Sequence, residues 1–396
     1  MKKNRLFRAF SLVTLVAFVL SAAVGCSSNT TAAAGGSAST GSAGAAKGEI
    51  LVGVSTGLTG SFTQDGEKVK DGILLAQDEI NNKGGVLGKN IKFIFEDDQN
   101  NATTVVNVVN KLASENIVAL LGPTLSSTVM AAEQTIKKNQ IPCLTGATSP
   151  KLITLNNPYL FRVRASDSTT AKVAAKYAVD NLKAKKIGIL YNNDEMGTGA
   201  KGVMEAYFKS INASYVSEGH NTGDKDMTGQ LVKMKNAGVD TLLIWTHDQE
   251  FAVTARQIKE LGLNVKVIGN PGLAMPQELN LMEKDWVEGF YCITDIVPTD
   301  TNENVQTFVK NFTAKYNTSP ELYSSAYYGA AIILSEAITK AGSTDSDKIC
   351  KALMEIKGLK GPEGEYNAND KGELLHECVI AQIKDKTPVM VDHVKE

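Results

Sequence analysis

Short apolar runs rich in β-branched residues alternate along most of the chain with longer segments in which apolar residues recur every three or four positions. Residues 50–54 form the first such run, and in residues 66–82 the side chains of Val69 and Ile73 recur at helical spacing. Runs of the first kind are typical of buried strands, and segments of the second kind are typical of amphipathic helices. We therefore expect a strand and then a helix that stops at the glycine pair 84–85.

The same alternation continues to residue 268. We expect further strands at residues 91–96, 117–121, 141–144, 186–191, 241–245 and 265–268, and helices at 102–115, 126–139, 172–182, 199–211 and 251–261. Strands that alternate with helices predict parallel sheets covered by helices on both faces. Two successive runs predict two doubly wound, Rossmann-like lobes, and in such sheets ligands bind at the carboxyl ends of the strands.

After Pro298 the pattern becomes mainly helical. We expect helices at residues 305–316, 324–341 and 346–356, and a β-rich tail at 377–383 that ends the ordered chain. A helical block that follows two completed lobes indicates that the chain crosses back to the first of them.

The amino-terminal residues are typical of a secretory signal. Four basic residues within the first eight positions precede an apolar run at residues 9–24, and small residues then lead to Cys26. This order defines an export signal, and the apolar run is shorter than the ~20 residues of a membrane span. A cysteine directly after the small residues resembles a lipobox, in which the sulfur is acylated and the chain is cut before Cys26. We therefore expect a signal peptide at residues 1–25.

Residues 26–47 predict a flexible tether, because beyond Cys26 they are Ser, Thr, Ala and Gly with one Asn and one Lys. Such a coil reaches roughly 25 Å. Cleavage would leave 396 − 25 = 371 residues, enough for two domains, with a formal net charge of −2 − 4 = −6. We expect no nucleic-acid partner, since binding to nucleic acid requires a basic face.

Cysteine and histidine patterns argue against a metal site. Neither a CxxC pair nor a histidine cluster occurs. In an exported chain the four cysteines after Cys26 could form disulfides or remain buried thiols, and their spacing leaves both open. The four are Cys143, Cys292, Cys350 and Cys378.

Residues 197–202 match GxGxxG, the dinucleotide-binding fingerprint. In a true fingerprint the strand turns directly into the helix, whereas about five residues intervene here. No nucleophile elbow is present either. We expect neither a cofactor nor an enzyme.

Several ordered motifs resemble the bacterial branched-chain amino acid-binding proteins. The most specific are residues 50–60 (ILVGVSTGLTG) and 80–88 (INNKGGVLG). In the same order follow Glu96-Asp97-Asp98, Leu121-Gly122-Pro123, Ser126-Ser127, Thr148-Ser149-Pro150, Phe161-Arg162-Val163 and Asp167. The resemblance implies the type I periplasmic-binding fold, whose two lobes are joined by three crossovers and close over a ligand. It places the first lobe at residues 48–167 and 297–375 and the second at 168–296 and 376–396.

Ser126 and Ser127 begin the helix expected at residues 126–139. Free N–H groups and the positive end of a helix dipole capture a carboxylate, although one serine could simply cap the helix. The resemblance favours a binding role for Ser126. It also implies that the Gly146 carbonyl accepts from a ligand amine and that Thr148 contacts the ammonium or carboxylate, whereas the plainer reading is a turn.

Three further positions correspond to aromatic residues of the family that surround the ligand. They are Met196, His247 and Tyr323. One departure concerns the ligand ammonium, which the family's leucine binders pair with a glutamate. Pro271 stands at that acidic position, and either Asp65 or Asp248 could replace the missing charge.

The resemblance implies an extracytoplasmic, lipid-anchored, monomeric solute-binding protein that delivers an amino acid or related small carboxylate to ABC permease subunits in the membrane. The ligand expected first is a branched-chain or other apolar amino acid. A binding module that reports to a sensor kinase or chemoreceptor would have the same cleft, so both functions remain open at this point.

Overall fold

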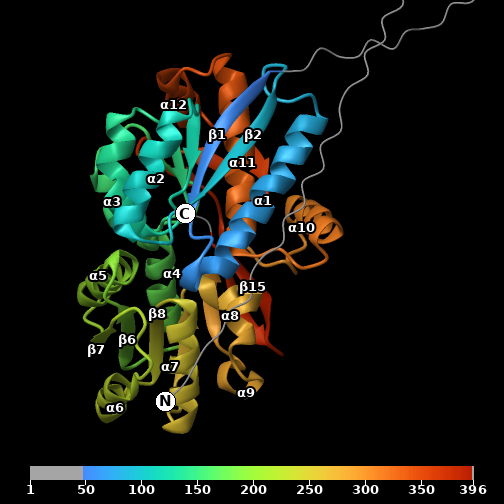
Figure 1. The fold of residues 1–396 in the computed structure, drawn as a ribbon. Helices are drawn as coiled ribbons and strands as arrows, with labels where there is room; N and C mark the ends of the chain where they lie inside the picture. Colours follow the sequence, from blue (N-terminus) through green and yellow to red (C-terminus); the bar gives the residue numbers. More distant parts are fainter. Residues whose placement is uncertain (1–47, 395–396) are drawn as a thin grey trace, which may run out of the picture. The chain divides into compact units, whose positions relative to one another are not determined.

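The computed structural model of the protein describes residues 48–394. The expected signal peptide, the tether and Cys26 lie outside this range. Most strands of the described chain belong to two sheets, one with five strands and one with seven (Figure 1). Each sheet carries its own helices and hydrophobic core, and we call these two parts the first and second lobe.

The sheet of the first lobe is parallel, with strand order β2-β1-β3-β4-β5. Its strands are β1 (Glu49–Thr56), β2 (Asn90–Asp97), β3 (Ala119–Leu121), β4 (Cys143–Thr145) and β5 (Leu160–Arg162). All of β3, β4 and β5 is buried, because helices cover both faces of the sheet.

The first lobe combines helices from both ends of the sequence. They are α1 (Thr63–Asn82), α2 (Ala102–Ser114), α3 (Ser126–Lys138), α11 (Leu322–Ala341) and α12 (Ser346–Met354). Between α1 and α11, a Cβ atom at Gly72 would lie 2.1 Å from the Ser324 carbonyl oxygen, so glycine is what permits this close approach. Helices α11 and α12 therefore complete the first core.

The sheet of the second lobe is mixed, with strand order β15-β14-β10-β9-β8-β6-β7. Five strands run parallel: β6 (Ile187–Asn192), β7 (Tyr215–His220), β8 (Thr241–Trp245), β9 (Lys266–Gly269) and β10 (Tyr291–Thr294). The last two strands, β14 (Cys378–Lys384) and β15 (Thr387–Val394), are antiparallel. The helices are α4 (Asp167–Asp180), α5 (Glu195–Ser210), α6 (Thr228–Asn236) and α7 (Asp248–Glu260).

Smaller elements complete the fold. The helices η1 (Gly60–Phe62), η2 (Pro150–Thr154), η3 (Pro271–Ala274), α8 (Pro276–Asn280) and α9 (Lys284–Val287) fill connections between larger elements. Helix α10 (Glu303–Tyr316) has 14 residues, and its Phe308 and Phe312 form a small separate hydrophobic cluster with Leu75. The short strands β11 (Leu359–Gly361), β12 (Gly364–Ala368) and β13 (Leu374–Leu375) form a separate antiparallel sheet.

The α/β fold with two doubly wound lobes is confirmed, but several predicted boundaries were wrong. The ordered chain does not end at residue 383, because β15 follows and extends the sheet. Helix α5 begins at Glu195 rather than at 199, since the Asp194 side chain caps it by accepting from the Gly197 N–H. Strands β5, β7 and β10, helix α6 and the three-stranded sheet were not predicted.

The described chain passes between the two lobes three times. It leaves the first lobe between β5 and α4, returns between β10 and α10, and leaves again between β13 and β14. These crossings carry Arg164, Asp295 and His376, one residue each. Both main sheets therefore end beside the same three connections.

Candidate ligand-binding site

A cavity opens where loops from both lobes meet, after the carboxyl ends of the strands. Its lining residues from the first lobe are Thr124, Leu125, Ser126, Gly146, Ala147, Thr148, Arg164, Leu322 and Tyr323. Its lining residues from the second lobe are Asp194, Met196, Thr246, His247, Asp248, Asn270, Pro271, Gly272 and Met275. Asp167, the first residue of α4, also lines it and lies at the boundary between the lobes.

Seven of the nine predicted site residues line this cavity. They are Ser126, Gly146, Thr148, Met196, His247, Pro271 and Tyr323. Ser127 is exposed and lies outside the lining, because neighbouring residues of a helix point about 100° apart. Asp65 is buried behind the lining, where its Oδ1 accepts a hydrogen bond from Gln277 Nε2 at 2.9 Å.

Ser126 is the first residue of α3 and is 5 % exposed. The residue before it, Leu125, offers no side-chain oxygen to cap the helix. Leu125 holds the N-cap position, so neither Ser126 nor Ser127 caps α3. Ser126 Oγ instead accepts a hydrogen bond from the Ser149 N–H at 3.1 Å. The start of α3 therefore faces the cavity with its dipole and with a hydroxyl proton available for donation.

The Gly146 loop is held by groups that the sequence alone does not single out. Tyr327 Oη accepts from the Gly146 N–H at 3.2 Å, and Arg164 Nη1 donates to the Gly146 carbonyl at 3.4 Å. The Arg164 guanidinium also lies over the Tyr323 ring, 5.5 Å from its centroid. Arg164 thus links the predicted acceptor Gly146 to the predicted side-chain wall Tyr323.

His247 and Asp194 form an ion pair at the edge of the cavity, with Nε2 and Oδ2 2.8 Å apart. Burial acts to lower the pKa of His247, but the Asp194 hydrogen bond and charge outweigh it and raise that pKa. Burial likewise acts to raise the pKa of Asp194, and contact with His247 reverses the shift. His247 therefore has a fixed partner within the protein.

Carboxyl groups gather behind Pro271, where the family's leucine binders carry a glutamate. Asp248 lines the cavity, whereas Glu278 and Asp65 lie behind the lining. Burial is the main cause that raises the pKa of each of the three, and repulsion from Asp248 adds to the shift for the other two. Because Gly272 has no side chain, it leaves room for the Glu278 carboxylate: a Cβ atom at Gly272 would lie 2.7 Å from Glu278 Oε2.

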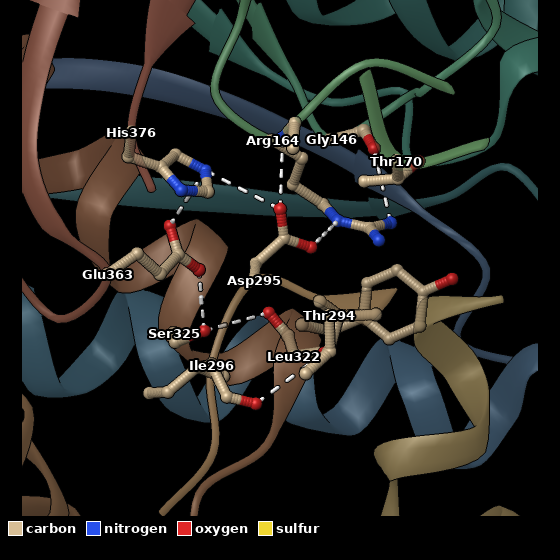
Figure 2. A network of polar contacts seen from close by, with 12 residues as sticks. Gly146, Arg164, Thr170, Thr294, Asp295, Ile296, Leu322, Ser325, Glu363 and His376 are labelled. Atoms are coloured by element: carbon tan, nitrogen blue, oxygen red, sulfur yellow. Dashed lines mark hydrogen bonds and ion pairs between the residues drawn. The ribbon is translucent and has the colours of Figure 1, made fainter. Parts of the chain in front are cut away.

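The three crossings meet in a buried polar network (Figure 2). Asp295 Oδ2 accepts from Arg164 Nε at 3.1 Å, and Asp295 Oδ1 accepts from the Ala165 N–H at 2.9 Å. His376 Nε2 lies 3.5 Å from Asp295 Oδ1 and 3.7 Å from Glu363 Oε2. Because Arg164 also lines the cavity, the network connects the crossings directly to the cavity wall.

The described residues also bear on metal binding, membrane spans and disulfides. Within residues 48–394, no group of three or more His, Cys, Asp or Glu side chains is placed to hold a metal ion. The same residues contain no helix that is long and apolar enough to cross a membrane. The four cysteines expected either to pair or to remain thiols are buried and free.

Comparisons with known proteins agree with this fold. A family model described as periplasmic binding protein matches residues 49–388. The Leu/Ile/Val-binding protein BraC3 of Rhizobium johnstonii is 28% identical over 336 residues, covering 82% of this chain and 89% of its own.

Two solved structures are similar in fold. The leucine-binding protein LivK from Thermotoga maritima superposes with a TM-score of 0.82 at 23% identity, covering 87% of this chain and 98% of that one. The branched-chain amino acid-binding protein LivJ from Streptococcus pneumoniae, solved with isoleucine, gives 0.79 at 22% identity, covering 87% and 100%. With a family model that spans most of its length, this chain belongs to the periplasmic binding protein family and is a binding protein rather than an enzyme.

Proposed function

We propose that this protein is a solute-binding lipoprotein of an ABC importer that holds an amino acid, or a related small carboxylate, between its lobes. The first lobe would comprise residues 48–167 and 297–375, and the second 168–296 and 376–396. The observation that carries the proposal is the buried start of α3, which faces a cavity walled by both lobes.

The start of α3 suits the carboxylate of the ligand. Ser126 already accepts a hydrogen bond from Ser149, so its own proton is free to point at a ligand oxygen. The hydroxyl of Thr148 lies in the same wall. A helix N-terminus with hydroxyl donors stabilises a carboxylate without requiring a buried cation.

One part of the remaining wall suits an apolar ligand side chain. This part contains Leu322, Tyr323, Met275, Met196 and Pro271. Methionine side chains adapt to irregular apolar surfaces, and a proline adds a rigid apolar face. The names of relatives such as the Leu/Ile/Val-binding protein BraC3 support the same ligand class.

The test is calorimetry on the purified soluble domain with leucine, isoleucine, valine and a panel of other amino acids and small carboxylates. We expect one-site binding of at least one aliphatic amino acid and a matching rise in melting temperature, because the ligand binds only the folded state. Binding of sugars or polyamines alone, with no response to any carboxylate, would refute the proposal.

Lipid anchoring through Cys26 is a separate part of the proposal. Replacing Cys26 by serine removes the sulfur that would be acylated, so we expect the protein to leave the membrane fraction or to remain uncleaved. Fractionation and the mass of the processed chain measure both effects. A Cys26→Ser protein that is still processed and still bound to the membrane would contradict the anchor.

A further inference from the structure

Two buried acceptor atoms in the cavity wall have no hydrogen-bond partner among residues 48–394. They are Oδ2 of Asp167, a residue 1 % exposed, and Oδ1 of Asn270, a residue 6 % exposed. Both residues line the cavity. A buried acceptor that has lost water and gained no donor costs free energy, and a ligand donor can recover it.

Both side chains are held at the end of the same strand. Asp167 Oδ1 accepts from the Trp245 indole Nε1 at 2.9 Å, and Asn270 Nδ2 donates to the Thr246 carbonyl at 2.9 Å. A carbonyl can only accept, so this bond fixes the Asn270 amide with Oδ1 on the other side. Consecutive residues at the end of β8 thus hold two residues of the cavity lining.

The ion pairs of the cavity leave Asp167 as a candidate partner for a ligand cation. Arg164 is paired with Asp295, and His247 is paired with Asp194. No ion pair within residues 48–394 involves Asp167. The charges of Arg164 and Arg162 lie nearby, but the hydrogen bonds that Asp167 accepts come from neutral donors. A buried carboxylate of this kind is stabilised most by a donor that carries positive charge.

We propose that Asp167 and Asn270 bind the ammonium group of the ligand, and that they replace the acid missing at Pro271. The proposal rests on the proposed function and narrows it: the ligand is an α-amino acid, and the same carboxylic acid without its amino group is a poor ligand. Ser126 at the start of α3 then receives the carboxylate, while Asp167 and Asn270 receive the ammonium.

The test compares matched pairs of ligands by calorimetry: leucine with 4-methylpentanoate, isoleucine with 3-methylpentanoate, and phenylalanine with 3-phenylpropanoate. Wild-type protein should bind the amino acid of at least one pair roughly 10- to 150-fold more tightly, the range for a hydrogen bond to a charged group. Asp167→Asn should reduce amino acid affinity by a similar factor and leave the des-amino acid unaffected, which removes the preference.

Two further variants separate binding from folding. Trp245→Phe removes the indole donor but keeps the Asp167 charge, and we expect a smaller loss that is confined to the amino acid. Asp98→Asn alters another buried carboxylate, which accepts from Ser55 Oγ at 2.7 Å and lies outside the cavity lining, so both members of a pair should bind as in wild type.

The outcomes distinguish failure of the ammonium site from failure of the proposed function. If the des-amino acids bind as tightly as the amino acids, or if Asp167→Asn weakens both members equally, the ammonium site is wrong while the carboxylate site stands. The ammonium site is also wrong if Asp167→Asn does not fold and Trp245→Phe leaves the preference intact. If no amino acid or carboxylate of the wider panel binds, the proposed function fails and the ammonium site fails with it.

Discussion

Ser126 has two hydrogen-bonding capacities, and the fold uses only one of them. Its oxygen accepts from the Ser149 N–H, while no acceptor within residues 48–394 takes its proton. Ser126→Ala should weaken binding of the amino acid ligand by roughly 10- to 150-fold, which corresponds to about 1.5–3 kcal/mol for a hydrogen bond to a charged group. Calorimetry measures this change.

Ser127→Ala is the matched control, because Ser127 is exposed and does not line the cavity. It should bind the ligand as wild type does. Thermal unfolding without ligand separates the loss of the Ser149 contact from the loss of binding. Equal affinity of the two alanine variants would exclude Ser126 as a ligand donor.

The His247–Asp194 pair should make stability depend on pH. The folded pKa of His247 is raised, so its contribution is complete below the unfolded value of about 6.5 and is lost as pH rises through the folded pKa. The folded pKa of Asp194 is lowered, so its contribution is present above about 3.9 and is lost as pH falls through the folded pKa. The pair therefore stabilises the protein most between these limits.

Asp194→Asn keeps an oxygen to cap α5 but removes the charge. We expect its free energy of unfolding, measured with urea from pH 5 to 9, to fall below that of wild type at pH 5–6. The difference should shrink towards pH 9, where His247 becomes neutral. A difference that does not change with pH would mean that the charge of His247 has no part in it.

The sequence predicts some site residues and misses others for a physical reason. Ser126, Gly146 and Thr148 follow strand ends within short motifs, so local pattern identifies them. Arg164 could not be recognised in this way, because its partner Asp295 is 131 positions away in the chain. Asn270 was likewise hidden, since its importance depends on the end of a different strand, β8.

Among the helices, the contact between α1 and α11 depends on one glycine. Alanine at Gly72 would place a methyl group 2.1 Å from the Ser324 carbonyl oxygen, and backbone has to move to relieve the clash. We expect Gly72→Ala to lower the free energy of unfolding by about 1–3 kcal/mol, as overpacking does. Urea titration of the purified domain measures it.

Gly202 provides the control for this prediction. It lies within α5, and a Cβ atom there would meet nothing within 4 Å. Gly202→Ala should therefore stabilise the protein by about 0.5–1 kcal/mol, since alanine loses less backbone entropy in a helix. If both variants lost stability equally, close packing at Gly72 would not be the cause.

Sequence periodicity located the elements with strong apolar patterns and missed several short or half-buried ones, two of which lie at the ends of a sheet. Strand β7 lies at one end of its sheet and β15 at the other, so each has a single neighbour and is largely half-buried or exposed. Helix α6 has nine residues, of which Leu231 and Met234 are buried. Such elements are stabilised by tertiary contacts rather than by their own pattern.

For the molecule as a whole, three crossings and a cavity walled by both lobes predict closure on binding. A ligand that contacts both walls favours the arrangement in which they are close, in the manner of a hinge. Small-angle scattering of the soluble domain should give a smaller radius of gyration with saturating leucine than without it. An unchanged radius under conditions where calorimetry shows binding would argue against hinge closure.

The shared carboxylate at the crossings also constrains how this protein can change by mutation. Asp295 holds Arg164 through one oxygen and the Ala165 backbone through the other, deep inside the molecule. Loss of Asp295 alone would strand a buried cation, whereas loss of Arg164 alone would strand a buried anion. Arg164 and Asp295 should therefore be gained or lost together in evolution. Homologues with a neutral residue at one of these positions are expected to have a neutral residue at the other.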